Sequence, residues 1–403
     1  MSRNPFKPKP GMLPEVFAGR QTEIEEFKKV FQNLSGGDAD PTLIVLYAPR
    51  GNGKTALLNY IEKHAVEFCD ELDITESIRI VNAVPGQCEL DKLYTTITGK
   101  EMPFQRNHMR GGNAGAQFIA RAEVKVESTN VNGSPAIGYA EVLKRACDER
   151  PTLLCIDEAH TMNKDNHREL FQSIQQCMQN QLPISLVLSG TPGILDVIAE
   201  CKASFTERYD EMTLRTLDDR SARMVFEEPF TSLGMKVPEE YIQEVMRNAQ
   251  NYPYFLQIYG RAAWEYCIEE GDFANSATLW AKVNSDFEKQ KNRMYRRRFD
   301  ELRKAQIVES AYELAKLYQF EERFLPEELT GYLDEKGVEN SDEVLRKLND
   351  LGYVWRPQGD EDFYEQGIPS LTNYVRERKD LQTSRTKILD RARRSSESDD
   401  SNQ

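Results

Sequence analysis

A glycine-rich turn followed by a lysine and a threonine is the clearest chemical signal in this sequence. The run 48–55 reads APRGNGKT and directly follows the apolar run 43–47. Backbone N–H groups beside two glycines can approach phosphate oxygens, the lysine brings a positive charge to the β- and γ-phosphates, and the threonine offers a hydroxyl to Mg²⁺. These residues are Gly51, Gly53, Lys54 and Thr55. Because Ala48 replaces the first glycine of G-x-x-x-x-G-K-[ST], a purely structural turn stays open on this motif alone.

Two adjacent carboxylates end a second apolar run further along the chain. Asp157 and Glu158 follow the run 152–156. At the carboxyl end of a strand beside the phosphate loop, Asp157 can hold Mg²⁺ through water, while Glu158 can orient the water that attacks a γ-phosphate. Taken alone, the two carboxylates could instead cap the next helix. Together with the run 48–55, they predict an ATPase with ATP and Mg²⁺ as its ligands.

Composition limits the class of protein. The chain has 403 residues, of which 39% are hydrophobic, enough for two or three domains with a substantial core. No stretch has the length of a membrane-spanning helix and residues 1–10 lack an apolar leader region, so we expect a cytoplasmic protein without a membrane partner. Seven cysteines without C-x-x-C spacing indicate reduced thiols. The net charge of −14 argues against a surface that binds nucleic acid as a whole.

Strand and helix patterns alternate in the first half of the chain. A helix beginning near Thr22 precedes the first strand, and the later elements are strands at 77–84, 152–156 and 184–190 with helices at 139–149 and 166–179. This alternation predicts a parallel sheet covered by helices on both faces. From Thr216 onward the patterns are helical. Three helices and a hairpin at 353–364 end the chain's regular part and predict a winged helix-turn-helix.

These patterns divide the chain into five parts. We expect an extended tail at 1–16, a P-loop core at 17–215, a helical lid at 216–302, a winged helix at 303–380 and a disordered tail at 381–403. The core carries an insertion at 98–138, which is glycine-rich and contains an Asn-Gly turn signal. It is either a small β-hairpin or a segment that a partner orders.

With these elements in place, the sequence resembles ASCE-class P-loop ATPases, close to the AAA+/STAND branch that includes archaeal-type and Orc/Cdc6-like ATPases, and more narrowly a group of bacterial AAA ATPases. The resemblance implies an α/β core with a parallel sheet of order 5-1-4-3-2, whose last strand lies near 211–214. The motifs that carry it are Asn4-Pro-Phe with 17–20, 48–55, Asp157-Glu158, 189–193, 205–208, 252–257 with Gly260 and Trp264, and the C-terminal winged helix.

The resemblance also implies roles for individual residues. Ser189 or Thr191 would be the polar sensor of the γ-phosphate, although both also suit a plain turn. Arg208 would be an arginine finger that reaches a neighbouring subunit, unless it is a surface arginine beside acidic residues. The nucleotide-binding set would be Gly19, Arg20, Pro49, Arg50, Gly51, Asn52, Gly53, Lys54, Thr55, Ala56 and Pro253, with Thr55 and Asp157 at the Mg²⁺.

Two classes of partner stay open besides a homo-oligomer. Winged helices commonly bind DNA, and the family resemblance favours an ATPase linked to duplex DNA. Eight acidic and three basic residues in 339–365 give a poor phosphate-binding surface, however, and favour a signalling switch that docks a protein effector. A basic stretch around Tyr295 could follow a nucleic-acid backbone or could be a solvated charged face. Its cations are Lys289, Lys291, Arg293, Arg296, Arg297, Arg298, Arg303 and Lys304.

Overall fold

A parallel five-stranded sheet lies at the centre of the first part of the chain, in the order β2-β3-β4-β1-β5. The strands are β1 (Leu43–Tyr47), β2 (Arg79–Ala83), β3 (Thr152–Ile156), β4 (Ile184–Gly190) and β5 (Asp210–Thr213). Every residue of β1, β3 and β4 is buried, as expected for strands covered on both faces. The computed structural model describes residues 3–9, 11–35, 39–101, 138–162, 164–201, 209–270, 277–358 and 363–400. The predicted α/β class and the sheet order 5-1-4-3-2 are confirmed.

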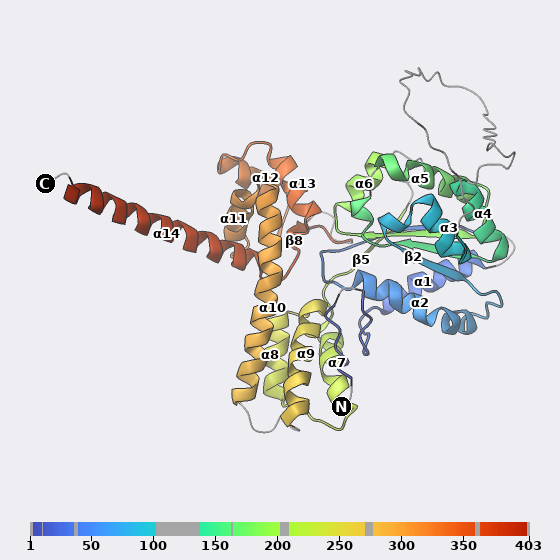
Figure 1. Cartoon of the computed structure of the whole chain (residues 1–403), viewed down its shortest axis with the longest axis horizontal. Coiled ribbons are helices and arrows are strands. Elements are labelled where there is room, and N and C mark those ends of the chain that lie inside the picture. Colours follow the sequence, from blue (N-terminus) through green and yellow to red (C-terminus); the bar gives the residue numbers. More distant parts are fainter. Residues whose placement is uncertain are drawn as a thin grey trace, which may run out of the picture.

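Helices cover both faces of this sheet. Figure 1 shows α1 (Gln21–Leu34) and α2 (Lys54–Glu71) on one face and α4 (Tyr139–Glu149) and α5 (Lys164–Gln179) on the other. The remaining helices of this core are α3 (Leu90–Thr98) and α6 (Ile194–Cys201), with short 3₁₀ turns η1 (Pro85–Gln87) and η2 (Ala159–Thr161). The hairpin expected within 98–138 lies, for residues 102–137, outside the described residues.

Four helices form a second unit, which we call the lid. They are α7 (Asp219–Thr231), α8 (Glu239–Ala249), α9 (Pro253–Glu270) and α10 (Ala277–Lys304). The side chain of Asp218 caps α7 by accepting a hydrogen bond from the Ser221 N–H. Aromatic side chains fill the interior of the lid, with Phe226, Phe230 and Tyr259 fully buried. The lid therefore has an apolar core separate from that of the sheet.

A C-terminal unit of helices and short strands follows α10. It contains α11 (Val308–Leu317), β6 (Arg323–Phe324), α12 (Pro326–Glu335), α13 (Ser341–Asp350), β7 (Val354–Trp355), β8 (Tyr364–Gln366) and the start of α14 (Leu371–Asp400). Its strands pair antiparallel in the order β6-β8-β7. The hairpin expected at 353–364 is present as β7 and β8, while β6 is a strand that the sequence pattern did not reveal because it spans two residues.

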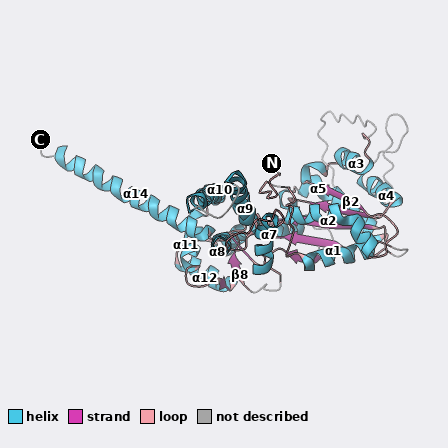
Figure 2. Cartoon of the chain, turned by 90° about the horizontal axis from the view of Figure 1, so that it is seen from below, coloured by secondary structure: helices cyan, strands magenta, loops and turns pink. Residues whose placement is uncertain are grey.

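Both ends of the chain have more structure than the sequence predicts. The N-terminal segment, by which we mean residues 3–9 and 11–17, is extended but packed, since Phe6 is buried among Phe226, Phe230 and Trp264. The expected disordered tail is helical in the structure, because α14 continues to Asp400. Figures 1 and 2 show α14 projecting away from the other elements in both views. Low hydrophobicity does not prevent local helix formation, which the arginine, lysine and glutamine residues of this tail favour.

Five of the seven cysteines are buried in the structure. Cys69, Cys88, Cys147, Cys155 and Cys177 are buried free thiols. Burial raises the pKa of the Cys88 thiol to about 12. Within the described ranges, every helix is too short or too polar to cross a bilayer.

Candidate functional site

The turn 48–55 connects β1 to α2, which begins at Lys54. Gly51 and Gly53 have φ values of +95° and +94°, which side chains with a Cβ rarely adopt, so both glycines are needed for the turn. Ala48 is not among the residues with positive φ. Glycine is therefore not required there, which accounts for the departure from the usual pattern. The ammonium group of Lys54 donates to the carbonyls of Ala48 (2.8 Å) and Pro49 (3.2 Å).

Three segments bring oxygen-bearing side chains together beside this turn. The hydroxyl of Thr55 donates to Asp157 Oδ2, and the hydroxyl of Ser189 donates to Asp157 Oδ1 at 2.8 Å. This convergence follows from the parallel pairing of β1, β3 and β4, whose carboxyl ends share one edge of the sheet. Hydroxyl and carboxylate oxygens are the ligands that Mg²⁺ prefers. Thr55 and Asp157 therefore fit a magnesium site at the start of α2.

Glu158 is held by contacts with the turn and with the loop after β4. Its Oε2 lies 3.4 Å from Arg50 Nη1 and 3.4 Å from His160 Nε2. The N–H of Thr191 donates to His160 Nδ1 at 3.3 Å, while Nε2 faces both Glu158 and Arg50 Nη2, the latter 3.3 Å away. Burial lowers the pKa of His160 to about 4, and the ring is neutral near pH 7. His160 thus lies between Glu158 and the 189–193 loop. In the sequence, the only sign of this role is that His160 stands two residues after Glu158.

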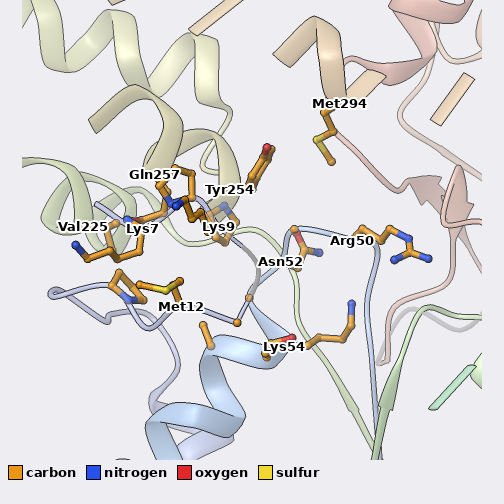
Figure 3. Close-up of a pocket in the computed structure, with 18 of the residues that line it drawn as sticks. Lys7, Lys9, Met12, Arg50, Asn52, Lys54, Val225, Tyr254, Gln257 and Met294 are labelled. Atoms are coloured by element: carbon orange, nitrogen blue, oxygen red, sulfur yellow. The ribbon is translucent and has the colours of Figure 1, made fainter. Parts of the chain in front are cut away.

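A cavity of about 470 Å³ lies between the core, the lid and the N-terminal segment. Figure 3 shows Lys54 and Asn52 from the turn, Lys7 and Lys9 from the N-terminal segment and Tyr254 from α9 around it. Among the residues that line it, Glu158 is the single acid, against eight cations. The cations are Lys7, Lys9, Arg20, Arg50, Lys54, Arg293, Arg297 and Arg298. In a chain with a net charge of −14, this concentration of positive charge fits a polyanionic ligand.

The electrostatics of Lys54 also fit a phosphate ligand. Burial lowers the pKa of Lys54 to about 8, while Asp157 and Glu158 oppose this shift. A phosphate placed near the ammonium group would favour the charged form further. Lys54 is therefore positioned to exchange its carbonyl contacts with the turn for contacts with an anion.

Gly19 and Arg20 support the turn from the side of the lid. Arg20 is buried, and its Nη2 donates to the carbonyls of Asn52 (3.0 Å) and Arg215 (2.8 Å). Gly19 has a φ of +72°, and an added Cβ would lie 2.7 Å from Cβ of Ser221. Arg20 therefore lines the cavity and holds the Asn52 carbonyl of the turn by a hydrogen bond. Its contact with an adenine remains a prediction.

The N-terminus of α9 closes another side of the turn. Pro253, the first residue of α9, and Ala56 both line the cavity. The N–H of Tyr254 donates to the carbonyl of Gly51 at 3.2 Å. The lid and the turn are therefore joined by a backbone hydrogen bond, which places Pro253 close to the expected nucleotide.

Two further arginines have a different standing in the structure. Arg208 lies outside the described residues, so its role as an arginine finger is untested. Arg261, which could be a second sensor in the lid or, as the helical periodicity favours, a solvent-facing arginine, pairs with Glu265 at 2.8 Å and is not among the residues that line the cavity. The lid cations that do line it come from α10. The sequence had singled them out only as a basic face.

Comparisons with known proteins bear on this arrangement. Residues 38–198 match the family described as an AAA domain. A Walker-type ATPase of Pyrococcus abyssi is similar in structure, with a TM-score of 0.58 and 16% identity over 90% of this chain and 96% of that chain. The ADP form of the ORC2 protein of Aeropyrum pernix has a TM-score of 0.54 and 15% identity over 92% and 97% of the chains. No curated protein matches the sequence. The chain thus has the α/β fold of AAA+ P-loop ATPases.

Proposed function

We propose, from the premise of an AAA+ P-loop ATPase fold with an AAA domain at 38–198, that this protein binds ATP with Mg²⁺ and hydrolyses it. The observation that carries the proposal is the convergence of Thr55, Asp157 and Ser189 beside a cavity lined by eight cations. The similar ORC2 protein of Aeropyrum pernix was solved with ADPNP and ADP, which supports an adenine nucleotide as the ligand.

The chemistry follows from the roles that these groups can fill. Backbone N–H groups of 51–55 and the Lys54 ammonium bind the phosphates, and Arg50 lies at the end of the cavity occupied by Glu158. Mg²⁺ bound by Thr55 and Asp157 would neutralise developing phosphate charge. Glu158 orients the attacking water and accepts its proton, and neutral His160 keeps the Glu158 carboxylate in place.

We further propose that the nucleotide acts as a conformational switch through the C-terminal unit. This unit touches the turn, because a Cβ at Gly367 would lie 3.2 Å from Pro49 Cγ and one at Gly352 would lie 3.3 Å from Pro49 Cα. Arg346 of α13 also pairs with Asp196 of α6. A nucleotide that displaces the turn would therefore change contacts with the C-terminal unit. In this proposal, residues 17–215 form the ATPase core, residues 216–302 form the lid and residues 303–380 form a winged helix.

For the partner, we propose duplex DNA or a protein effector, bound by a homo-oligomer in which Arg208 reaches a neighbouring nucleotide. The charge distribution favours the protein effector. Among the α10 cations, Lys289 and Arg303 pair with acids on the same helix, and Arg293 and Arg297 line the cavity. Fewer cations are then left for a DNA backbone than the sequence suggests.

The experiment that tests the proposed function compares the wild-type protein with Glu158→Gln. Wild type should release phosphate from ATP only with Mg²⁺, whereas Glu158→Gln should bind ATP and lose turnover by about 100-fold or more. Glu265→Gln, an exposed acid on α9, is the matched control and should behave as wild type. Size-exclusion chromatography with ATP, with and without duplex DNA, tests assembly and partner. Equal turnover in Glu158→Gln and wild type would refute the assigned site.

A further inference from the structure

The N-terminal segment forms one wall of the cavity beside the turn 48–55. Eight of the residues that line the cavity belong to this segment, among them Lys7, Lys9 and Met12. Figure 3 shows Lys7 and Met12 on the side of the cavity away from Arg50 and Lys54. Because Arg50 and Lys54 belong to the turn that binds phosphates, the segment covers the opposite end of the cavity. The remainder of a bound nucleotide would therefore lie against this segment.

Phe6 holds the N-terminal segment to the lid. Its buried ring packs on Phe230 and Trp264, with ring centroids 5.6 Å and 6.4 Å apart. The ring occupies the space above Gly260 of α9, where an added Cβ would lie 2.1 Å from Phe6 Cε1. The three atoms nearest to that Cβ all belong to Phe6. The contact with the lid therefore depends on one aromatic ring and on the absence of a side chain opposite it.

Among the described residues, every hydrogen bond between the N-terminal segment and the lid or the core involves a side chain. The N–H of Lys7 donates to Gln257 Oε1 of the lid at 2.7 Å, and the Asn59 amide of α2 donates to the Gly11 carbonyl at 2.8 Å. The segment has neither helical nor strand structure. It can therefore leave the lid without breaking the backbone hydrogen bonds of a helix or of the sheet.

The other end of the segment is fixed to the core. Phe17 stacks on Tyr60 of α2, with ring centroids 4.4 Å apart and an interplanar angle of 16°. The segment thus runs from the lid, at Phe6, to the helix that begins at Lys54 of the phosphate-binding turn. A lid that moves away from the core must pull Phe6 out of its contact or carry the segment with it.

We propose that the N-terminal segment is a gate for nucleotide exchange and that Phe6 keeps the gate closed by its contact with the lid. The gate is closed when the Phe6 ring lies above Gly260, and a nucleotide enters or leaves after the ring has left this position. The inference rests on the proposed function, because the exchanged ligand is the nucleotide bound at the turn 48–55. Phe6 acts on the cavity through the segment and is therefore a positioning residue.

Stopped-flow measurements with a fluorescent ADP derivative test the gate by giving the rates of association and of release. Phe6→Ala removes the ring, whereas Gly260→Ala places a methyl group where the ring lies, so each should open the gate. Release should accelerate by roughly tenfold or more and association by a smaller factor, because a required conformational change slows binding. A wall that only contacts the nucleotide would alter release and leave association unchanged.

A double variant tests whether both substitutions act on the same contact. Phe6→Ala/Gly260→Ala should match the single variants instead of multiplying their effects, and the vacated ring position leaves room for the new methyl group. Gly331→Ala, in α12 with open space around its Cβ, and Phe320→Ala, at an exposed side chain, are the matched controls. Both controls should exchange nucleotide at wild-type rates, and thermal unfolding identifies the variants that are folded.

Three results would overturn the inference: wild-type rates in folded Phe6→Ala and Gly260→Ala, faster release without faster association, or multiplied effects in the double variant. If wild type and both controls fail to bind the ADP derivative, the proposed function itself fails. Binding by wild type with unchanged exchange in the variants refutes the gate alone, which distinguishes the two failures.

Discussion

The hydroxyl of Tyr252 lies directly against Gly51, so closely that a Cβ at Gly51 would be 2.4 Å from the hydroxyl oxygen. Tyr252 is fully buried at the entry to α9, and its hydroxyl has no hydrogen-bond partner among the described residues. The phosphate-binding turn and the lid therefore meet at a contact that admits only glycine on one side. Substitutions on its two sides, at Gly51 and at Tyr252, therefore have different expected effects on stability and on nucleotide binding.

Gly51→Ala should destabilise the protein and abolish nucleotide binding. Alanine cannot adopt a φ of +95° without strain, which costs roughly 1–3 kcal/mol, and its methyl group would also displace Tyr252. Thermal unfolding and nucleotide titration measure the two effects. Gly234→Ala, which also has a positive φ but has open space around its Cβ, controls for strain alone and should keep nucleotide binding.

Tyr252→Phe should stabilise the nucleotide-free protein by about 1 kcal/mol. The change removes a buried hydroxyl that lacks a partner, and an unsatisfied buried polar group costs roughly 1–3 kcal/mol. Denaturant unfolding gives the free energy of unfolding directly. A loss of stability in Tyr252→Phe would mean that the hydroxyl is hydrogen-bonded, which the structure does not predict.

Phe6→Ala should release the N-terminal segment from the lid. The Phe6 ring occupies the space above Gly260, where a Cβ would lie 2.1 Å from a ring carbon, and it packs on Phe226 and Phe230. Truncating a buried phenylalanine costs about 3–5 kcal/mol, and this is an upper bound because the segment can detach. Because Lys7 lines the cavity, nucleotide affinity should fall as well. Phe320→Ala, at a side chain that is 87% exposed, should change neither quantity.

Asp350, at the contact between α13 and α6, should make the protein more stable as the pH falls. Burial and the nearby Asp196 carboxylate raise the pKa of Asp350 from 3.8 to about 6, although Arg346 opposes the shift. The folded state therefore binds a proton that the unfolded state releases between these two values, and stability is lost as the pH rises through 6. Denaturant unfolding from about pH 4 to about pH 7 should show this slope. In Asp350→Asn the slope should be reduced, and an unchanged slope would contradict the assignment.

Nucleotide affinity should decline above about pH 8. Burial lowers the pKa of Lys54 to this value, and only the charged ammonium attracts phosphate. Titrations from about pH 7 to about pH 9 should show weakening in wild type and in Lys63→Ala, which changes an exposed lysine on the same helix. Lys54→Ala should bind weakly at every pH. A pH dependence that survives in Lys54→Ala would assign the titration to another group.

Local patterns were sufficient for the site's framework. The apolar runs at 43–47, 152–156 and 184–190 are strands with the expected bounds, and every residue of these strands is buried. Gly352 ends α13 in the left-handed conformation, as its place after Leu351 predicts. Asp157, which follows β3 directly, and Ser189, which lies at the carboxyl end of β4, could therefore be assigned to one sheet edge from the sequence.

Contacts between distant parts of the chain could not be read in this way. Nothing in the proline-rich sequence of the N-terminal segment shows that Phe6 fits above Gly260, since the fit depends on how α7 and α9 pack. Likewise, the charges of α10 indicate a basic helix but not which cations turn toward a cavity. The length of α14 was also missed, because low hydrophobicity was taken to mean disorder.

The sequence by itself determined the chemistry of the turn 48–55 and of Asp157, since a phosphate-binding turn depends on glycine conformation and on residues adjacent in the chain. The tertiary structure alone decided what surrounds that turn, because long-range packing brings α10 and the C-terminal unit to it. Arg298 reaches the cavity, and Gly352 and Gly367 reach Pro49, only because the lid and the C-terminal unit fold against the core. The nucleotide site was thus predictable, whereas its connection to the rest of the molecule was not.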